Sequence, residues 1–542
     1  MEQLSGMDAS FLYFETPNAP GHVFSVWIYD QSSAPDGLVT FKQILEHVES
    51  RLHVSRTFRQ RLVSVPLGLD HPYWIEDPDF DLEYHVRHIA LPRPGDWRQF
   101  CIQVARLHSR ALDRSRPLWE MYVIEGLDDV AGLPRGSFAI MTKIHHAAVD
   151  GVTLLEITSA LNQVDPDAPA PAPTKDWRPE RVPSTFDLLS RAALNAAARP
   201  MRLARLTAAP VPGVADVRRE QRARRNFELP ALSPAPRTRF SGPVSTHRVI
   251  EARRFDLATA KEIKAAVAGA TINDVAITVV GGALRAYLLE KGELPDAALR
   301  VMAPISTRTP EQAGTAGNQV SAMIVTAGTD VADPRQRLAA VHESTAASKA
   351  TAEATGARDL AQFSELAPGG LVALAARTAS QFEMATRTTP LVNTVVSNVP
   401  GSQVPLYFGG ARLVTFFGGA GVTDGMGLLH GVSSYAGQLI LSVVSDREML
   451  PDPGHYADLL EQSFAELAAA TGATGASAGA GAERERPRHR RRTTRTAARA
   501  PSTGRDPKAI RAWARENRIA VPARGRIPGD VERQFNEAHR RS

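Results

Sequence analysis

The chain has 542 residues, of which 43% are hydrophobic and 22% charged, so it is long enough for several folding units with sizeable cores. Its single cysteine, Cys101, excludes a disulfide framework, a zinc ribbon and a CxxC redox pair. We expect no transmembrane helix and no signal peptide, and therefore a cytoplasmic protein.

The net charge of +5 conceals an asymmetry between the tail and the body of the chain. Residues 482–542 carry 18 Lys and Arg against 7 Asp and Glu, a charge of +11, which leaves −6 for the remainder. A basic tail on a mildly acidic body favours a polyanionic partner, either nucleic acid or an acidic membrane.

Helical and strand patterns alternate irregularly along the chain. We expect strands at residues 121–124, 137–144, 391–397 and 438–444, and helices at 152–161, 257–267 and 272–288. This order predicts an α/β fold with mixed sheets.

Two linkers divide the chain. Residues 165–243 hold 13 of its 38 prolines, and they include a helical pattern at 186–206 that Pro200 should break or kink. We expect a crossover helix; a membrane-surface helix is the alternative, because several arginines can lie on one side. A Gly/Ala-rich spacer begins near residue 471. The predicted domains are an N-terminal half (1–164), a Pro-rich linker (165–244), a C-terminal half (245–470), a basic linker (471–505) and a small module (506–542).

The sharpest local feature is the sequence His145-His146-Ala-Ala-Val-Asp150-Gly151, between an expected strand and an expected helix. A histidine there titrates near neutral pH and can accept a proton from a hydroxyl group. Gly151 permits a tight turn, and Asp150 is expected to hold that turn through hydrogen bonds. Adjacent side chains on extended backbone point to opposite faces, so we predict no metal site.

An ordered set of motifs resembles the bacterial wax ester synthase/diacylglycerol acyltransferases, within the CoA-dependent acyltransferases that share HHxxxDG. The resemblance spans roughly residues 4–470 and includes the following segments: Leu4-Ser-Gly-Met-Asp-Ala-Ser-Phe-Leu12, Pro117-Leu118-Trp119, Asn273-Asp274-Val275, Ser397-Asn398-Val-Pro-Gly401, Ser434-Tyr435 and Asp446. HHxxxDG alone is also similar to condensation domains and chloramphenicol-acetyltransferase-like enzymes, whereas the ordered set is more specific.

The resemblance implies two chloramphenicol-acetyltransferase-like halves with a tunnel between them. It implies an O-acyltransferase in which His146 is the general base, His145 supports it and Asp150 is structural. An acceptor hydroxyl would attack the acyl-CoA thioester directly, without an acyl-enzyme. The implied substrates are acyl-CoA and a lipid alcohol, most simply diacylglycerol or a fatty alcohol, with no cofactor. Substrate contacts are expected at Gly151, Pro117, Leu118, Trp119, Ser397 and Asn398.

Several motif residues also have structural interpretations. Thr271 can cap the helix that Asn273 and Asp274 begin, so we predict a structural role for that pair. Trp119 has the character of a core aromatic residue, although it is retained as a site candidate. The glycine-rich run 418–421 lacks the Lys-Ser/Thr of a phosphate loop, and we interpret it as a turn.

The C-terminal segment predicts two short helices, at about 506–517 and 528–539, around a small core. Between them, Arg524-Gly525-Arg526 can enter a narrow A·T minor groove. The segment resembles the DNA-binding domain of the small H-NS-like nucleoid-bridging protein of actinobacteria. The resemblance implies binding to AT-rich DNA and nucleoid association; the alternative is attachment of the tail to an anionic membrane.

We therefore expect an acyltransferase that transfers a long acyl chain to diacylglycerol or a fatty alcohol at a membrane or lipid-body surface. One rival is a DNA-binding or tethering protein whose acyltransferase body is only a lipid-binding scaffold. A second rival is a condensation enzyme that makes amides on carrier proteins.

Overall fold

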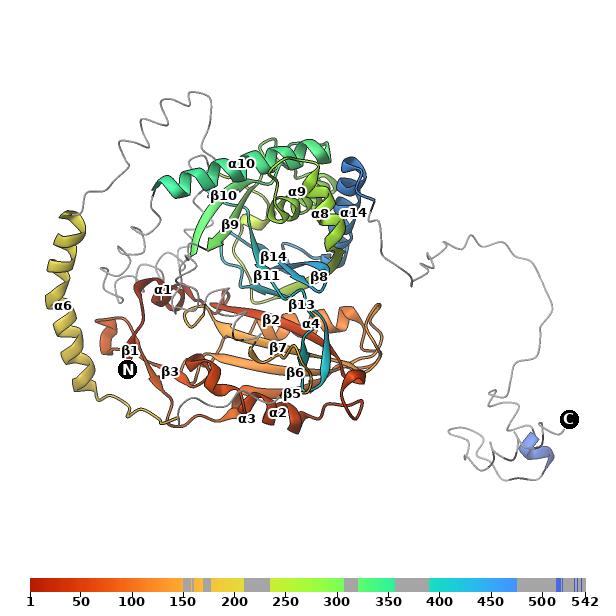
Figure 1. Ribbon diagram of the computed structural model, residues 1–542, viewed down its shortest axis with the longest axis horizontal. Coiled ribbons are helices and arrows are strands. Elements are labelled where there is room, and N and C mark those ends of the chain that lie inside the picture. The colour runs from red at the N-terminus through yellow and green to blue at the C-terminus, as the bar shows by residue number, and fades with distance from the viewer. Residues whose placement is uncertain are drawn as a thin grey trace. The chain divides into compact units, whose positions relative to one another are not determined.

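The computed structural model describes residues 1–149, 157, 160–168, 177–208, 234–306, 320–355 and 389–474, and near the C-terminus 513–517, 519, 531, 534 and 538. The chain forms two compact units, residues 1–478 and 479–542. The first unit holds two layered α/β halves (Figure 1).

The N-terminal half is built on a mixed six-stranded sheet in the order β12-β13-β2-β7-β6-β5. β5 pairs with β6 in parallel, and the other neighbouring strands are antiparallel. Its strands are β2 (His22–Asp30), β5 (Val86–Ala90), β6 (Trp119–Leu127), β7 (Ser137–His145), β12 (Tyr407–Phe408) and β13 (Ala411–Ala420). Helices of this half include α1 (Gly6–Phe14), α2 (Phe41–Glu49), α3 (Leu82–His85) and α4 (Trp97–His108).

A small antiparallel sheet lies beside it, in the order β1-β4-β3. Its strands are β1 (Glu2–Gln3), β3 (Gln60–Val63) and β4 (Tyr73–Glu76), with a 3-10 turn, η4 (Pro66–Gly68), between β3 and β4. α6 (Thr185–Ala208) contacts η4. This helix continues through Pro200, so the break expected there does not occur, although proline cannot donate the backbone hydrogen bond of a helix interior.

The C-terminal half carries the second mixed six-stranded sheet, in the order β10-β9-β11-β14-β15-β8. Its strands are β8 (Arg248–Asp256), β9 (Arg300–Ser306), β10 (Val320–Thr326), β11 (Thr394–Pro400), β14 (Leu428–Tyr435) and β15 (Gln438–Asp446). α8 (Leu257–Ala265), α9 (Ile272–Glu290), α10 (Pro334–Thr355) and α14 (Pro453–Thr471) pack together on this half (Figure 1).

α9 is long and apolar enough to cross a membrane by composition, yet most of its length is buried among its neighbours. Thr271 caps it, and the Asp274 carboxylate accepts a hydrogen bond from the Thr271 amide at 2.8 Å. The predicted cap is confirmed, and α9 is a core helix within the described residues.

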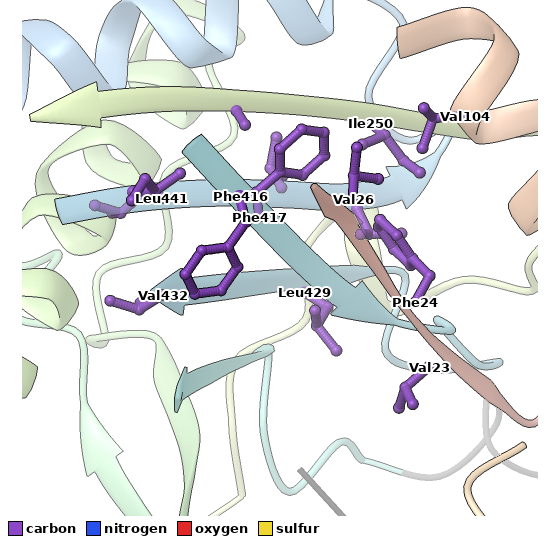
Figure 2. Close-up of a cluster of buried hydrophobic side chains, with 14 of the residues drawn as sticks. Val23, Phe24, Val26, Val104, Ile250, Phe416, Phe417, Leu429, Val432 and Leu441 are labelled. Atoms are coloured by element: carbon purple, nitrogen blue, oxygen red, sulfur yellow. The ribbon is translucent and has the colours of Figure 1, made fainter. Parts of the chain in front are cut away.

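The two large sheets share one core. The β12–β13 hairpin, although late in the chain, pairs with β2 of the N-terminal sheet, and β13 crosses β14 and β15 of the other sheet. Figure 2 shows side chains from both sheets meeting here, with Phe24 and Val26 from one and Leu429 and Leu441 from the other. The hairpin therefore joins the halves by backbone pairing as well as by apolar burial.

The glycine-rich run that the sequence suggested as a turn is strand: residues 418–420 belong to β13. The backbones come too close for side chains. A Cβ on Gly431 of β14 would lie 2.3 Å from the Gly418 carbonyl oxygen, and one on Gly418 would lie 2.6 Å from the Phe24 carbonyl oxygen. Close strand crossing, rather than turn geometry, explains the glycines.

Candidate active site

The histidine pair stands at the C-terminal end of β7, in the middle of the N-terminal sheet. All nine residues of this central strand are buried, and it ends at His145. The His145 amide donates to the Leu118 carbonyl at 2.9 Å, and the His146 amide donates to the Gly21 carbonyl at 2.9 Å. The backbone of both histidines is thus fixed between the chain that enters β2 and the chain that enters β6.

The His145 ring is fully buried and held in one tautomer. Its Nδ1 accepts a hydrogen bond from the Ala147 amide at 3.0 Å, so the proton of a neutral ring resides on Nε2. Nε2 lies 3.3 Å from Oε2 of Glu15, to which it donates. His145 therefore has both nitrogens committed within the protein.

Glu15 is an acidic partner that sequence reasoning missed. It follows α1 and also forms an ion pair with Arg114. Burial favours the neutral acid, but hydrogen bonds from His145 and Arg114 outweigh it and lower the pKa of Glu15 to about 2. Glu15 is thus a carboxylate at neutral pH and stabilises the Nε2–H tautomer of His145. Glu15 lies just after the N-terminal motif, and nothing in the sequence around it indicates that it contacts His145.

His146 has a different environment from that of His145. Its ring stacks on Phe11 of α1, with centroids 4.0 Å apart and planes 7° from parallel, and it retains partial exposure. Of the two adjacent histidines, His146 is therefore the less buried. Phe11 lies within the N-terminal motif, but the sequence did not reveal this stacking.

Gly21 makes room for this arrangement. A Cβ there would lie 2.9 Å from Nε2 of His145 and 3.0 Å from the Phe11 carbonyl oxygen. Glycine thus permits the segment before β2 to cross directly over the histidine pair.

The segment Pro117-Leu118-Trp119 contacts the histidine motif through its backbone. The three residues are buried, and the Leu118 carbonyl holds the His145 amide. The Trp119 indole donates to the Phe58 carbonyl at 2.9 Å and stacks on His85, with centroids 4.5 Å apart. Trp119 thus occupies the core, whereas Leu118 reaches the histidine motif through its backbone.

A buried polar cluster follows the same face of the sheet. The Lys143 ammonium group contacts Glu120 at 3.2 Å and the Arg110 carbonyl at 2.7 Å, and Glu120 also pairs with Arg87 at 3.2 Å. Burial lowers the pKa of Lys143, and Glu120 opposes that shift. Sequence reasoning did not identify this cluster, because its members are dispersed over four segments.

His22 and His108 form a second buried pair beside His145. Their Nε2 and Nδ1 atoms are 3.1 Å apart, and His22 is the direct strand partner of His145. Burial lowers the pKa of His22 well below its usual value and that of His108 to about 3, and Lys143 adds to both shifts. Both imidazoles are therefore neutral at physiological pH.

The remaining predicted residues lie in the C-terminal half or outside the described residues. Ser397 and Asn398 are half-buried on β11, with Gly431 and Val432 of β14 as their strand partners. Asp274 is buried in the α9 cap and contacts Nδ1 of His342 at 3.1 Å, and Asn273 lies beside it in that first turn. Five predicted site residues fall outside the described part of the chain: Asp150, Gly151, Arg524, Gly525 and Arg526.

Neither a metal centre nor a thiol nucleophile emerges from the described residues. Among them, no group of three His, Cys, Asp or Glu side chains could hold a metal ion. Cys101 is buried in α4, and burial raises the pKa of its thiol well above the usual value. Of the two motif histidines, His145 is fully buried and His146 is partly exposed.

The second unit contains a miniature apolar core. Residues 513–516 are helical, and buried Ala514 and Val531 pack with Trp513 and Ile519. This places the expected tryptophan helix against the beginning of the second expected helix.

Comparison with known proteins covers nearly the whole chain. The wax ester synthase/diacylglycerol acyltransferase catalytic domain matches residues 4–276, the C-terminal domain of the same family matches 316–468, and the Lsr2 DNA-binding domain matches 502–538. These matches confirm both resemblances inferred from the motifs.

Individual relatives agree. Two Mycobacterium tuberculosis (strain CDC 1551 / Oshkosh) proteins named as diacylglycerol O-acyltransferases are similar to the chain. One is 35% identical to this chain, and the match covers 86% of this chain and 90% of the relative. The other is 34% identical, and the match covers 87% of this chain and 98% of the relative. The solved wax ester synthase/diacylglycerol acyltransferase from Marinobacter aquaeolei VT8 superposes with a TM-score of 0.61 and 26% identity, over 87% of this chain and all of its own.

The mixed-sheet halves and the histidine motif define an acyltransferase of the two-half type, as expected. The chain belongs to the wax ester synthase/diacylglycerol acyltransferase family, and it ends in an Lsr2-type DNA-binding domain.

Proposed function

We propose that His146 is the general base of acyl transfer from acyl-CoA to a lipid alcohol, most simply diacylglycerol. The observation that carries this proposal is the division of labour in the pair. Glu15 and Ala147 occupy both nitrogens of buried His145, while the His146 ring is partly exposed. His145 is then a positioning residue, and Asp150 keeps its predicted structural role.

The proposed reaction has two steps. His146 takes the proton of the acceptor hydroxyl as its oxygen attacks the thioester carbonyl carbon. The tetrahedral intermediate then expels the CoA thiolate, which recovers a proton from protonated His146. The products are an ester and CoA, without an acyl-enzyme or a cofactor, and Cys101 takes no part. Ser397 and Asn398 remain predicted substrate contacts. The tunnel between the halves also remains a prediction.

The test compares wild type with His146→Ala and measures acyl-CoA consumption and ester formation with diacylglycerol or a long-chain alcohol. We expect the substitution to reduce turnover by about 10²–10⁴-fold, the usual contribution of a general base. An unchanged melting temperature would show that the fold survives loss of the Phe11 contact. Undiminished turnover would contradict the proposal.

Two rival functions predict different results. A lipid-binding scaffold would form no ester with either alcohol although the wild-type protein is folded. A condensation enzyme would consume a carrier-bound thioester and form an amide, with no turnover of free acyl-CoA. The ordered family motifs favour the lipid acyltransferase over both rivals.

We propose further that the C-terminal domain binds AT-rich DNA through Arg524-Gly525-Arg526 and associates with the nucleoid. A glycine between two arginines has no side chain to keep the backbone away from a narrow minor groove, which the arginines can then enter. The adjoining Arg-rich linker can contact phosphates. AT-rich duplex should bind more tightly than GC-rich duplex, and Arg524→Ala with Arg526→Ala should remove that preference. Equal binding to both duplexes and to anionic vesicles would instead favour membrane attachment by the tail.

The acceptor and the ester are insoluble lipids, so we also propose that the acyltransferase unit works at the inner membrane or at a lipid-body surface without spanning it. This location follows from the substrates rather than from the catalytic geometry.

A further inference from the structure

α6 attaches to the N-terminal half along one narrow side. Leu188 and Ala192 are buried with Val65 and Tyr73 of the small sheet. One turn further along the helix, the Asn195 amide donates to Asp70 at 2.7 Å, and it also contacts Gln3 and Tyr73. These contacts fix which face of the helix meets the protein.

A second apolar face of α6 covers nothing in the described structure. Phe186 is 78% exposed and Leu189 is 38% exposed, and exposed alanines continue the row at positions 193, 196 and 197. Spacings of three and four residues place them along one side of a helix. At about 100° per residue, this side differs from the one that carries Leu188 and Ala192.

The neighbouring turn also exposes large apolar side chains. η4 contacts α6, and its Leu67 is 91% exposed, with a positive φ of 57°. Leu69, just after the turn, is 48% exposed. A large apolar side chain at the tip of a turn is poorly explained by the fold of the monomer. We call Leu67, Leu69, Phe186 and Leu189 the α6 apolar surface.

Basic residues accompany the α6 apolar surface. Residues 177–208 contain six arginines against two acids, a charge of +4, although the chain before the tail is −6. Arg178, Arg181 and Arg191 are exposed, while both acids serve local contacts: Glu180 accepts from the N-terminal ammonium group, and Asp187 accepts from Ser184 at the start of α6. Exposed apolar residues combined with local positive charge are typical of a helix that lies on an anionic lipid surface.

We propose that the α6 apolar surface inserts into the headgroup region of an anionic phospholipid membrane, with the nearby arginines contacting lipid phosphates. The inference rests on the proposed function in one respect, since a lipid acyl acceptor must be collected from such a surface. It deepens that function by assigning membrane contact to α6 and η4 of the acyltransferase unit rather than to the basic tail.

The direct test places an environment-sensitive fluorophore at single positions of the full chain. The native Cys101 is buried, so Leu67→Cys and Leu189→Cys each offer one reactive thiol, and Leu289→Cys on α9, 53% exposed, is the matched control. Mixed phosphatidylcholine and phosphatidylglycerol vesicles should shift emission to the blue at 67 and 189 but not at 289. No shift at 67 and 189, or an equal shift at all three positions, would overturn the proposal.

An activity test separates this inference from the proposed function. We expect Leu67→Gln with Phe186→Gln to lower ester formation from vesicle-embedded diacylglycerol at least about fivefold, and to leave turnover of water-soluble dioctanoylglycerol unchanged. The control, Leu38→Gln with Leu289→Gln, should match wild type in both assays.

The two failures are distinguishable. If wild type makes no ester from either acceptor, the proposed function fails, while the fluorescence result still decides whether α6 inserts. If the emission shift appears without vesicles and rises with protein concentration, the surface joins two copies of the chain, and the membrane proposal is wrong.

Discussion

Glu15 and His145, separated by 130 residues in sequence, meet through a hydrogen bond of 3.3 Å between Oε2 and Nε2. The contact brings α1 against the end of β7, and Arg114 completes it from the segment before β6. The N-terminal motif and the histidine motif are thus parts of one structure: Phe11 stacks on one histidine and Glu15 orients the other.

Replacement of Glu15 by Gln should destabilise the protein by about 1–3 kcal/mol at neutral pH, because a buried charge-assisted contact is lost. The folded-state pKa of Glu15, about 2, lies below that of an exposed carboxyl group. Its stabilisation is therefore fully present above about pH 5 and declines as the pH falls toward 2. Unfolding by denaturant at several pH values checks this: the difference between wild type and variant should be constant from pH 6 to 8 and shrink at lower pH. A difference that grows on acidification would contradict the assignment.

Replacement of Gly431 by Ala should cost at least about 2 kcal/mol, since overpacking at a rigid backbone crossing cannot relax cheaply. The new Cβ would lie 2.3 Å from the Gly418 carbonyl oxygen and 2.5 Å from Oγ of Ser442. Gly454 in the first turn of α14 is the matched control, because nothing lies within 4 Å of an added Cβ. Gly454→Ala should be neutral or stabilising by up to about 1 kcal/mol. Thermal unfolding of both variants measures the contrast, and equal effects would contradict the close crossing.

Sequence patterns predicted the elements whose signals are local. The strand ending before His145 and the helix beginning at Ile272 lie where expected, because continuous apolar residues and the Thr271 cap specify them directly. The histidine motif is also a local pattern, and it stays the predicted centre of the site.

Features set by distant pairing were not predicted. Nothing near Tyr407 or Phe408 indicates that this hairpin joins a sheet that begins at His22, since strand register between remote segments leaves no local pattern. The glycines near 418 were misinterpreted because a close backbone crossing and a turn use the same residue type. Glu15 was missed because a single acid has no meaning until its buried partners are known.

The buried cluster of Lys143, Glu120 and Arg87 yields an asymmetric prediction. Glu120→Gln leaves the Lys143 ammonium group with only the Arg110 carbonyl as a strong partner, whereas Lys143→Met leaves Glu120 paired with Arg87. Removing one partner of a buried ion pair costs about 3–5 kcal/mol when the other charge remains uncompensated. Glu120→Gln should therefore destabilise the protein more than Lys143→Met.

The pH dependence of Glu120→Gln separates this electrostatic effect from simple loss of packing. Burial already lowers the pKa of Lys143, and without Glu120 that pKa should fall further. A folded-state pKa below the unfolded value means that the unfolded chain binds more protons, so the stability of the variant rises with pH toward the lysine value of about 10.4. The deficit relative to wild type, measured by denaturant unfolding, should thus shrink between pH 7 and 9. A deficit that stays constant over this range would show that lost packing, and not an uncompensated ammonium group, causes the destabilisation.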